Sequence, residues 1–260
     1  NVGEIARWRA SADRVLSLYE DTWQLDRDLR GSATPRITRE GSDEARLRIA
    51  DLCIAEPSGR ILLEHFDADV GPGERVLVAG DPSVTGGLFK VIGGLWPWGS
   101  GRVTLPADGG LLFMPQRPYL PEGTLREALC YPQPADGRTD DELRIALERV
   151  GLSSLLPRLD ERDNWDQALP LRAQQQLGFA RALVQRPDWI FMEGATDAFD
   201  PAGERQILQM LHEALPGAAL LVISFHPGLE PLHDRTLVLE RVAETRFLFA
   251  GRRANGGTNH

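Results

Sequence analysis

The stretch Glu74–Gly94, ERVLVAGDPSVTGGLFKVIGG, contains the pattern that decides the fold. The apolar run 76–79 predicts a buried strand, and a glycine-rich turn follows from Gly80 to Gly87. Apolar residues then recur at helical spacing: Leu88, Phe89, Val91, Ile92 and Leu95. A strand, a glycine-rich turn and a helix in this order surround a nucleotide's phosphates with backbone N–H groups. The usual motif is G-x-x-x-x-G-K-[ST], but this turn has no lysine, and Lys90 falls inside the predicted helix.

The composition is that of a globular protein, with 42% hydrophobic and 26% charged residues among 260. The net charge of −9 argues against nucleic acid or an anionic membrane surface as the main partner. Cys53 and Cys130 have no metal-binding spacing and are interpreted as buried thiols of a reducing compartment. The longest apolar runs are too short to span a bilayer, and no signal peptide is visible. Because the chain begins at Asn1, we expect a piece of a longer polypeptide.

Strands and helices alternate on both sides of the central stretch. The predicted strands are 47–54 and 60–63, which form a hairpin, and 101–105, 111–114, 188–193, 218–224, 236–240 and 246–250. The predicted helices are 2–30, 124–130, 140–150, 153–157, 171–185 and 201–215, and residues 31–43 are expected to be a linker. This order predicts an α/β core with a mainly parallel sheet and an inserted helical lobe.

Several further segments carry a family resemblance. They are GGLWP at 93–97, FMPQRPY at 113–119, GTLR at 123–126, FARAL at 179–183, PDWIF at 187–191 and ATDAFD at 195–200, with His226 beyond them. Together they resemble the nucleotide-binding domain of ABC transporters. The resemblance is to subfamily D, the peroxisomal fatty-acyl type, and to related bacterial peptide-transporter-like proteins.

The resemblance implies a P-loop NTPase-like core with a mainly parallel sheet, an antiparallel β edge and an inserted helical subdomain. Residues 1–40 would be a helix and linker continuing from a missing membrane domain. Residues 41–117 and 187–250 would form the ATP-binding core, 118–186 the helical subdomain that carries the signature, and 251–260 a disordered tail. ATP and Mg²⁺ are the implied ligands.

By this resemblance the turn residues that bind phosphate are Gly80, Asp81, Ser83, Val84, Thr85, Gly86 and Gly87. The turn is one residue shorter than the family loop, so Thr85 or Gly86 falls where lysine belongs. Pro82 removes one amide donor, and Asp81 adds a negative charge. We therefore expect weak ATP binding, although the residues taken alone also fit a plain strand–turn–helix.

The predicted Mg²⁺ ligands are Thr85, Gln116 and Glu193. The magnesium-binding hydroxyl would fall on Gly86 or Gly87, which leaves Thr85 as the only substitute nearby. Glu193 stands where the family has an aspartate, and it is alternatively a solvated strand end. The next residue, Gly194, replaces the family's catalytic glutamate and has no side chain to orient a water.

The signature segment reads Leu169, Pro170, Leu171, Arg172, Ala173 and Gln174. Arg172 stands in place of a phosphate-facing glycine, and it is either a phosphate contact or an ordinary surface arginine. Gln116 is intact, and Asp200 matches a nucleotide-site aspartate or caps the following helix. His226 is a weak catalytic candidate beside Glu193, because its run is one residue short.

Three functions remain open on these residues. The chain is an ABC-type domain that couples nucleotide binding to transport with a degenerate site and little or no hydrolysis, so enzyme activity is uncertain. Alternatively it is a competent ATPase that uses loop amides, Glu193 and His226, or an inactive soluble scaffold. The implied partners are a transmembrane domain and a second nucleotide-binding domain, as a homo- or heterodimer. The implied location is the cytoplasmic face of a membrane, with the bacterial inner membrane favoured.

Overall fold

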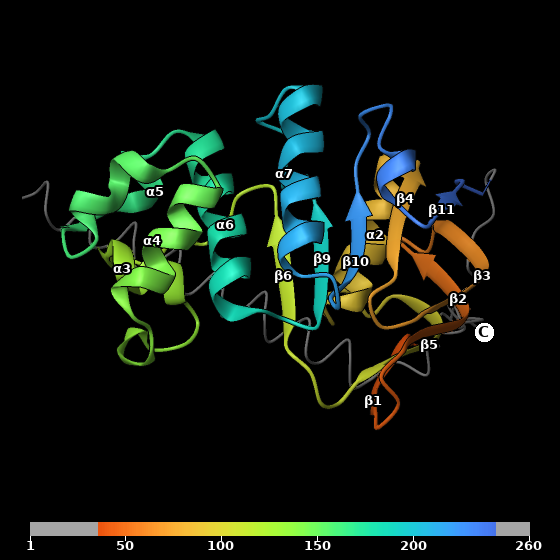
Figure 1. Cartoon of the computed structure of the whole chain (residues 1–260). Coiled ribbons are helices and arrows are strands. Elements are labelled where there is room, and N and C mark those ends of the chain that lie inside the picture. The colour runs from red at the N-terminus through yellow and green to blue at the C-terminus, as the bar shows by residue number, and fades with distance from the viewer. Residues whose placement is uncertain (1–35, 243–260) are drawn as a thin grey trace, which may run out of the picture. The chain divides into compact units, whose positions relative to one another are not determined.

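The computed structural model describes residues 36–242, and the account below concerns this part of the chain. The strands (Figure 1) are β1 Thr38–Ser42, β2 Leu47–Ala55, β3 Ile61–Val70, β4 Arg75–Gly80, β5 Gly99–Pro106, β6 Leu111–Pro115, β7 Gly123–Thr124, β8 Arg162–Asp163, β9 Trp189–Glu193, β10 Ala219–Ile223 and β11 Arg235–Leu239. The α-helices are α2 Pro82–Ile92, α3 Leu125–Cys130, α4 Asp140–Arg149, α5 Trp165–Ala168, α6 Leu171–Gln185 and α7 Pro201–Ala214. Three short 3₁₀ helices complete the set: η1 Ala135–Gly137, η2 Ser153–Arg158 and η3 Glu230–Leu232.

A five-stranded sheet forms the centre, in the order β11-β4-β10-β9-β6, and every neighbouring pair is parallel. The predicted mainly parallel sheet is therefore confirmed. A second sheet has the order β1-β5-β2-β3; β1 pairs with β5 in parallel, and the other two pairs are antiparallel. The antiparallel strands expected at an edge thus belong to a sheet of their own.

The inner strands β4, β10 and β9 of the parallel sheet are buried on both faces, and alternate residues of each strand point to opposite sides. In β4, Val76 and Val78 join the core shared with α2 and the second sheet, whereas Leu77 joins the core on the other side. Strands β9 and β10 alternate in the same way. Helix α2 contacts β4 and β9 of one sheet and β2 and β3 of the other, so it packs between the two sheets.

The helical lobe lies in the chain between β6 and β9. Two of its helices begin with capping boxes: Thr124 caps α3 with Glu127, and Thr139 caps α4 with Glu142. Helix α6 contacts both α3 and α4 (Figure 1). The predicted helices 140–150 and 171–185 match α4 and α6 closely, and the predicted segment 153–157 is a 3₁₀ helix.

Some predictions differ from the structure or lie beyond it. Residues 31–43 were expected to be a linker, but Thr38–Ser42 form β1, because their backbone pairs with β5. The predicted helix 2–30, strand 246–250 and tail 251–260 lie outside the described residues. Among residues 36–242, no helix combines the length and apolar character needed to cross a bilayer.

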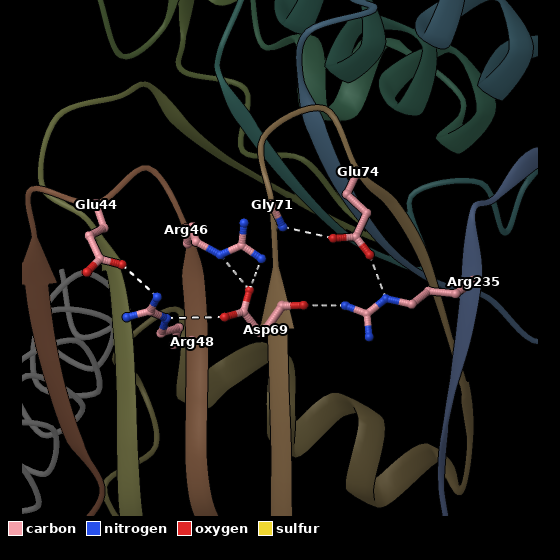
Figure 2. Close-up of polar contacts among 7 residues, drawn as sticks. All are labelled: Glu44, Arg46, Arg48, Asp69, Gly71, Glu74 and Arg235. Atoms are coloured by element: carbon pink, nitrogen blue, oxygen red, sulfur yellow. Dashed lines mark hydrogen bonds and ion pairs between the residues drawn. The ribbon is translucent and has the colours of Figure 1, made fainter.

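A polar network joins the two sheets (Figure 2). Asp69 of β3 accepts hydrogen bonds from Arg46, which precedes β2, and from Arg48 of β2, and its backbone carbonyl accepts one from Arg235 of β11. The Arg235 Nε also donates to Glu74 at 2.5 Å. The hydrogen bond from Arg46 lowers the pKa of Asp69, so this carboxylate stays ionised at neutral pH. Arg235 thereby links the parallel sheet to the second sheet.

Candidate functional site

The predicted site residues gather at one edge of the parallel sheet. Because the strands are parallel, their carboxyl ends meet at this edge, where α/β proteins bind their ligands. In register, Pro115 lies beside Glu193, Glu193 beside Ile223, and Ile223 beside Val78. The residues at and just beyond these strand ends therefore converge; they include Gly80, Asp81, Gln116, Gly194, Ser224 and His226.

The turn predicted from Gly80 to Gly87 is wrong in extent, because helix α2 already begins at Pro82. Asp81 is its N-cap: the side chain accepts a hydrogen bond from the Ser83 N–H at 2.8 Å. The Asp81 carbonyl accepts from the N–H groups of Val84 and Thr85, both at 3.0 Å. Asp at the cap followed by Pro at the first position is a strong helix start, and it ends the turn early.

The remaining turn residues serve packing. Gly80 has a φ of +128°, and a Cβ there would lie 2.0 Å from the Leu239 carbonyl oxygen, so only glycine fits against β11. Thr85, Gly86 and Gly87 are buried within helix α2. The Thr85 hydroxyl donates to the Pro82 carbonyl at 3.4 Å. Thr85, Gly86 and Gly87 therefore belong to helix α2 and not to the turn that precedes it.

The hydroxyl and N–H of Ser83 both bond to Asp81, and these hydrogen bonds lower the pKa of the Asp81 carboxyl group. The start of α2 thus carries its own ionised carboxylate. Lys90 lies inside the helix as predicted, with its Nζ 5.5 Å from the centre of the Trp96 ring.

Glu193 ends β9 half-buried against helix α2. A Cβ built on Gly86 would lie 2.7 Å from the Glu193 Oε1, so the carboxylate packs onto this glycine. Burial raises the pKa of Glu193; the charge of Lys90 opposes the shift, and that of Asp197 adds to it. The predicted acid is therefore less readily ionised than an exposed glutamate.

Gly194 has a left-handed backbone and no room for a side chain. Its φ is +63°, and a built Cβ would lie 2.8 Å from the Asp197 Oδ2 and 3.2 Å from the Gln116 Cβ. Asp197 in turn accepts a hydrogen bond of 2.7 Å from the Gln116 Nε2. The space that a side chain at 194 would need is thus filled by Asp197 and Gln116.

Gln175, on helix α6, joins three parts of this edge. Its Nε2 donates to the carbonyls of Gln116 at 2.9 Å and Gly194 at 3.1 Å. Its Oε1 accepts from the Ala198 N–H at 3.1 Å. Sequence reasoning missed both Gln175 and Asp197. For Gln175, the available signal was an amide side chain on the buried face of a helix. For Asp197, it was a further carboxylate between Glu193 and Asp200.

His226 is held by a buried carboxylate that the sequence reasoning also missed. Glu204 of α7 has no exposed surface, and it accepts from His226 Nδ1 at 2.5 Å. The hydroxyls of Thr196 and Ser224 donate to the same carboxylate at 2.6 and 2.9 Å. A signal was present, since Glu204 shares the buried stripe of α7 with Leu208 and Leu211.

The signature segment starts helix α6, which begins at Leu171. Arg172 lies over the Phe199 ring at 4.8 Å, with its Nη1 3.8 Å from the Asp200 Oδ1. Gln174 is buried and donates to two backbone carbonyls, those of Asp166 and Leu169, both at 2.8 Å. Asp200 occupies the N-cap position of α7 without a capping side-chain bond. The Arg172 side chain therefore packs against the segment that contains Asp200.

The predicted Mg²⁺ ligands differ in whether their oxygen atoms are free to bind a metal ion. Thr85 does not fit, because its hydroxyl is buried and bonded to the Pro82 carbonyl. Gln116 and Glu193 offer oxygen atoms, which Mg²⁺ prefers, on adjacent strand ends. Within residues 36–242 no group of three or more His, Cys, Asp or Glu side chains is arranged to hold a metal. A magnesium ion here would therefore need water or phosphate oxygens as further ligands.

An apolar cavity of about 460 Å³ lies beside the Gln116 loop, with Pro115 and Pro118 in its wall. Leu95, Tyr119 and Tyr131 also line it and are 73%, 63% and 39% exposed. Large apolar side chains gathered at a surface commonly mark a contact with another protein segment.

No protein-family model matches the chain. An uncharacterized ABC transporter ATP-binding protein of Synechocystis sp. is 34% identical over 258 residues, which are 95% of this chain and 38% of that protein. The inner membrane ABC transporter ATP-binding protein YddA of Escherichia coli is 29% identical, over 89% of this chain and 39% of that protein. ABC transporter D family member 1 of Arabidopsis thaliana is 31% identical, over 88% of this chain and 18% of that protein.

Among solved structures, a bacterial Atm1-family ABC exporter with ATP bound matches with a TM-score of 0.63. The identity is 19%, and the match covers 76% of this chain and 38% of that chain, so this likeness concerns the fold alone. The chain thus spans well under half the length of these relatives.

Proposed function

By sequence and fold the chain is a nucleotide-binding domain of the ABC transporter type that resembles subfamily D, and on this premise we propose its function. It is the ATP-binding domain of a membrane transporter and couples nucleotide binding to transport. Its site is degenerate: it binds ATP weakly and hydrolyses it slowly or not at all.

The observation that carries this proposal is the start of helix α2. The Asp81 carboxylate accepts the Ser83 N–H that a phosphate oxygen would otherwise accept, and it places a negative charge there. The only lysine of the stretch, Lys90, lies at Trp96 instead of at the helix start. Burying a phosphate without a paired cation is costly, which supports weak binding.

Slow or absent hydrolysis is supported by Glu193 and Gly194. When bound, Mg²⁺ neutralises phosphate charge, and Gln116 and Glu193 are the residues that would hold it. Glu193 is half-buried, and burial raises its pKa. Gly194 offers no carboxylate. The Nδ1 of His226 is already hydrogen-bonded to Glu204. We retain Glu193 and His226 as weak catalytic candidates on these grounds.

The proposed partners are a membrane domain, in the same polypeptide, and a second nucleotide-binding domain. The named relatives are more than twice as long as the matched chain, which leaves length for a membrane domain. The apolar cavity with Leu95, Tyr119 and Tyr131 beside Gln116 supports docking of that domain. The segment 169–174 and Asp200 would face the partner copy. The location would be the cytoplasmic face of a membrane, with the bacterial inner membrane favoured.

We also propose the domain boundaries that the sequence suggested. The ATP-binding core would comprise 41–117 and 187–250, joined by the first residues of β1 from Thr38 on, and the helical subdomain would comprise 118–186. The run of helices between β6 and β9 supports this division.

Titration calorimetry of the 260-residue chain with ATP, with and without Mg²⁺, tests the proposal. We expect a Kd near or above about 1 mM, equivalent to about −4 kcal/mol. A Kd of about 1 μM, or about −8 kcal/mol, would contradict weak binding and favour a competent ATPase. No binding at any accessible concentration would favour an inactive scaffold, a second candidate that the self-capped helix α2 also supports.

A further inference from the structure

The Asp197 carboxylate lies in the space that a side chain at position 194 would occupy. Its Oδ2 is 2.8 Å from the point where a Cβ on Gly194 would be. The residue that lacks a side chain and the residue that supplies a carboxylate are three positions apart, in the turn between β9 and α7. A carboxylate from position 197 therefore lies beside the point where a side chain at position 194 would begin.

Asp197 is oriented and accessible at the same time. The Gln116 Nε2 donates to its Oδ2 at 2.7 Å, which fixes the carboxylate against the end of β6. The residue as a whole is exposed, so a substrate or a water molecule can reach it. Gln175 holds the two backbone segments that frame it, through the carbonyls of Gln116 and Gly194. An ordered but accessible carboxylate is suited to accept a proton.

We propose that Asp197 is the general base of the slow hydrolysis, and the inference rests on the proposed function. Asp197 accepts a proton from the water molecule whose oxygen bonds to the γ-phosphorus of ATP. The bond between that phosphorus and the β–γ bridging oxygen breaks, and its electron pair leaves with ADP. The products are ADP and inorganic phosphate, and Asp197 then releases the proton to solvent.

The other acids at this edge are engaged elsewhere. Glu193 is half-buried, with its Oε1 packed onto Gly86. Asp81 caps helix α2, and Asp200 lies beside the Arg172 guanidinium at 3.8 Å. Asp197 is thus the carboxylate that is both held beside Gly194 and open to solvent.

Single-turnover hydrolysis of radiolabelled ATP by the full 260-residue chain tests the inference. In Asp197→Asn, the amide oxygen still accepts from Gln116, but the side chain cannot take a proton. We expect the hydrolysis rate to fall about 100-fold or more, the usual effect of losing a general base. The Kd for ATP and the Tm should stay at their original values.

Two further variants separate chemistry from folding. Asp141→Asn removes an exposed carboxylate on α4 that pairs with Arg144, and it should hydrolyse at the original rate. The double variant Gly194→Glu/Asp197→Ser moves the carboxylate back to position 194 and removes the Asp197 carboxylate that a Cβ there would meet. It should hydrolyse ATP faster than Asp197→Ser alone.

The outcomes distinguish this inference from the proposed function. If Asp197→Asn hydrolyses at the original rate, or loses ATP affinity and Tm together with rate, Asp197 is not the base. If the chain binds ATP but does not hydrolyse it, only this inference is wrong. If it binds no ATP, the proposed function is wrong as well.

Discussion

The Asp81 carboxylate accepts a hydrogen bond from the backbone N–H of Ser83 at 2.8 Å, at the first turn of helix α2. The same N–H would face a phosphate at a helix N-terminus. One side chain therefore stabilises the helix and repels the anion that the fold would otherwise bind.

Substitutions of Asp81 separate these two effects. Asp81→Asn removes the charge and keeps a good cap, so we expect an unchanged Tm and about fivefold tighter ATP binding, or about 1 kcal/mol. Asp81→Ala loses the cap and should lower the free energy of unfolding by about 1 kcal/mol. Urea titration and calorimetry measure the two quantities. An unchanged Kd in Asp81→Asn would show that the charge does not limit binding.

Gly194→Ala should destabilise the fold. A backbone with a φ of +63° is energetically unfavourable for any residue other than glycine. The new Cβ would also clash with Asp197 and Gln116. We expect a loss of about 1–3 kcal/mol in the free energy of unfolding. Gly217→Ala is the matched control, because a Cβ there meets no atom within 4 Å. Equal stabilities of the two variants would contradict the crowding at 194.

Glu204→Gln should destabilise the protein through its buried hydrogen bonds. The new amide group meets the His226 Nδ1 and the hydroxyls of Thr196 and Ser224, and it cannot accept from all three. We expect a loss of about 1–3 kcal/mol by urea unfolding. Glu213→Gln, an exposed change on the same helix, should stay within about 0.5 kcal/mol of the original. Equal losses of unfolding free energy in the two variants would contradict the structural role assigned to Glu204.

His212 should make the protein sensitive to mild acid. Burial, with the charge of Arg75 adding to it, lowers the pKa of His212 from 6.5 to about 4. Between these values the unfolded chain binds more protons than the folded one. Stability is thus complete above pH 6.5 and falls as the pH drops toward 4, by about 1–2 kcal/mol after solvent screening.

Urea unfolding at several pH values, compared with His212→Gln, checks this dependence. Buried His233 contacts His212, and burial also lowers its pKa, so part of the slope should persist in the variant. Carboxylates with lowered pKa values, such as Asp69 and Asp234, lose their contribution only at lower pH. Identical slopes in the two proteins would exclude His212 as a cause.

The sequence alone determined the order and type of most elements. Apolar periodicity predicted α4, α6 and the parallel strands, because period and capping are properties of neighbouring residues. The Asp81-Pro82 pair also contained the signal for an early start of α2. The expected phosphate motif instead suggested a longer turn.

Only the tertiary structure decided which side chains meet at the site. Asp197 and Gln116 are 81 residues apart in the sequence, and Glu204 and His226 are 22 residues apart. Neither contact can be predicted from helix or strand periodicity, because that periodicity relates only residues within one element. These contacts exist because parallel strands bring the ends of β6, β9 and β10 to one edge. Which side chain then fills the space beside Gly194 depends on packing in three dimensions, and there it is the carboxylate of Asp197.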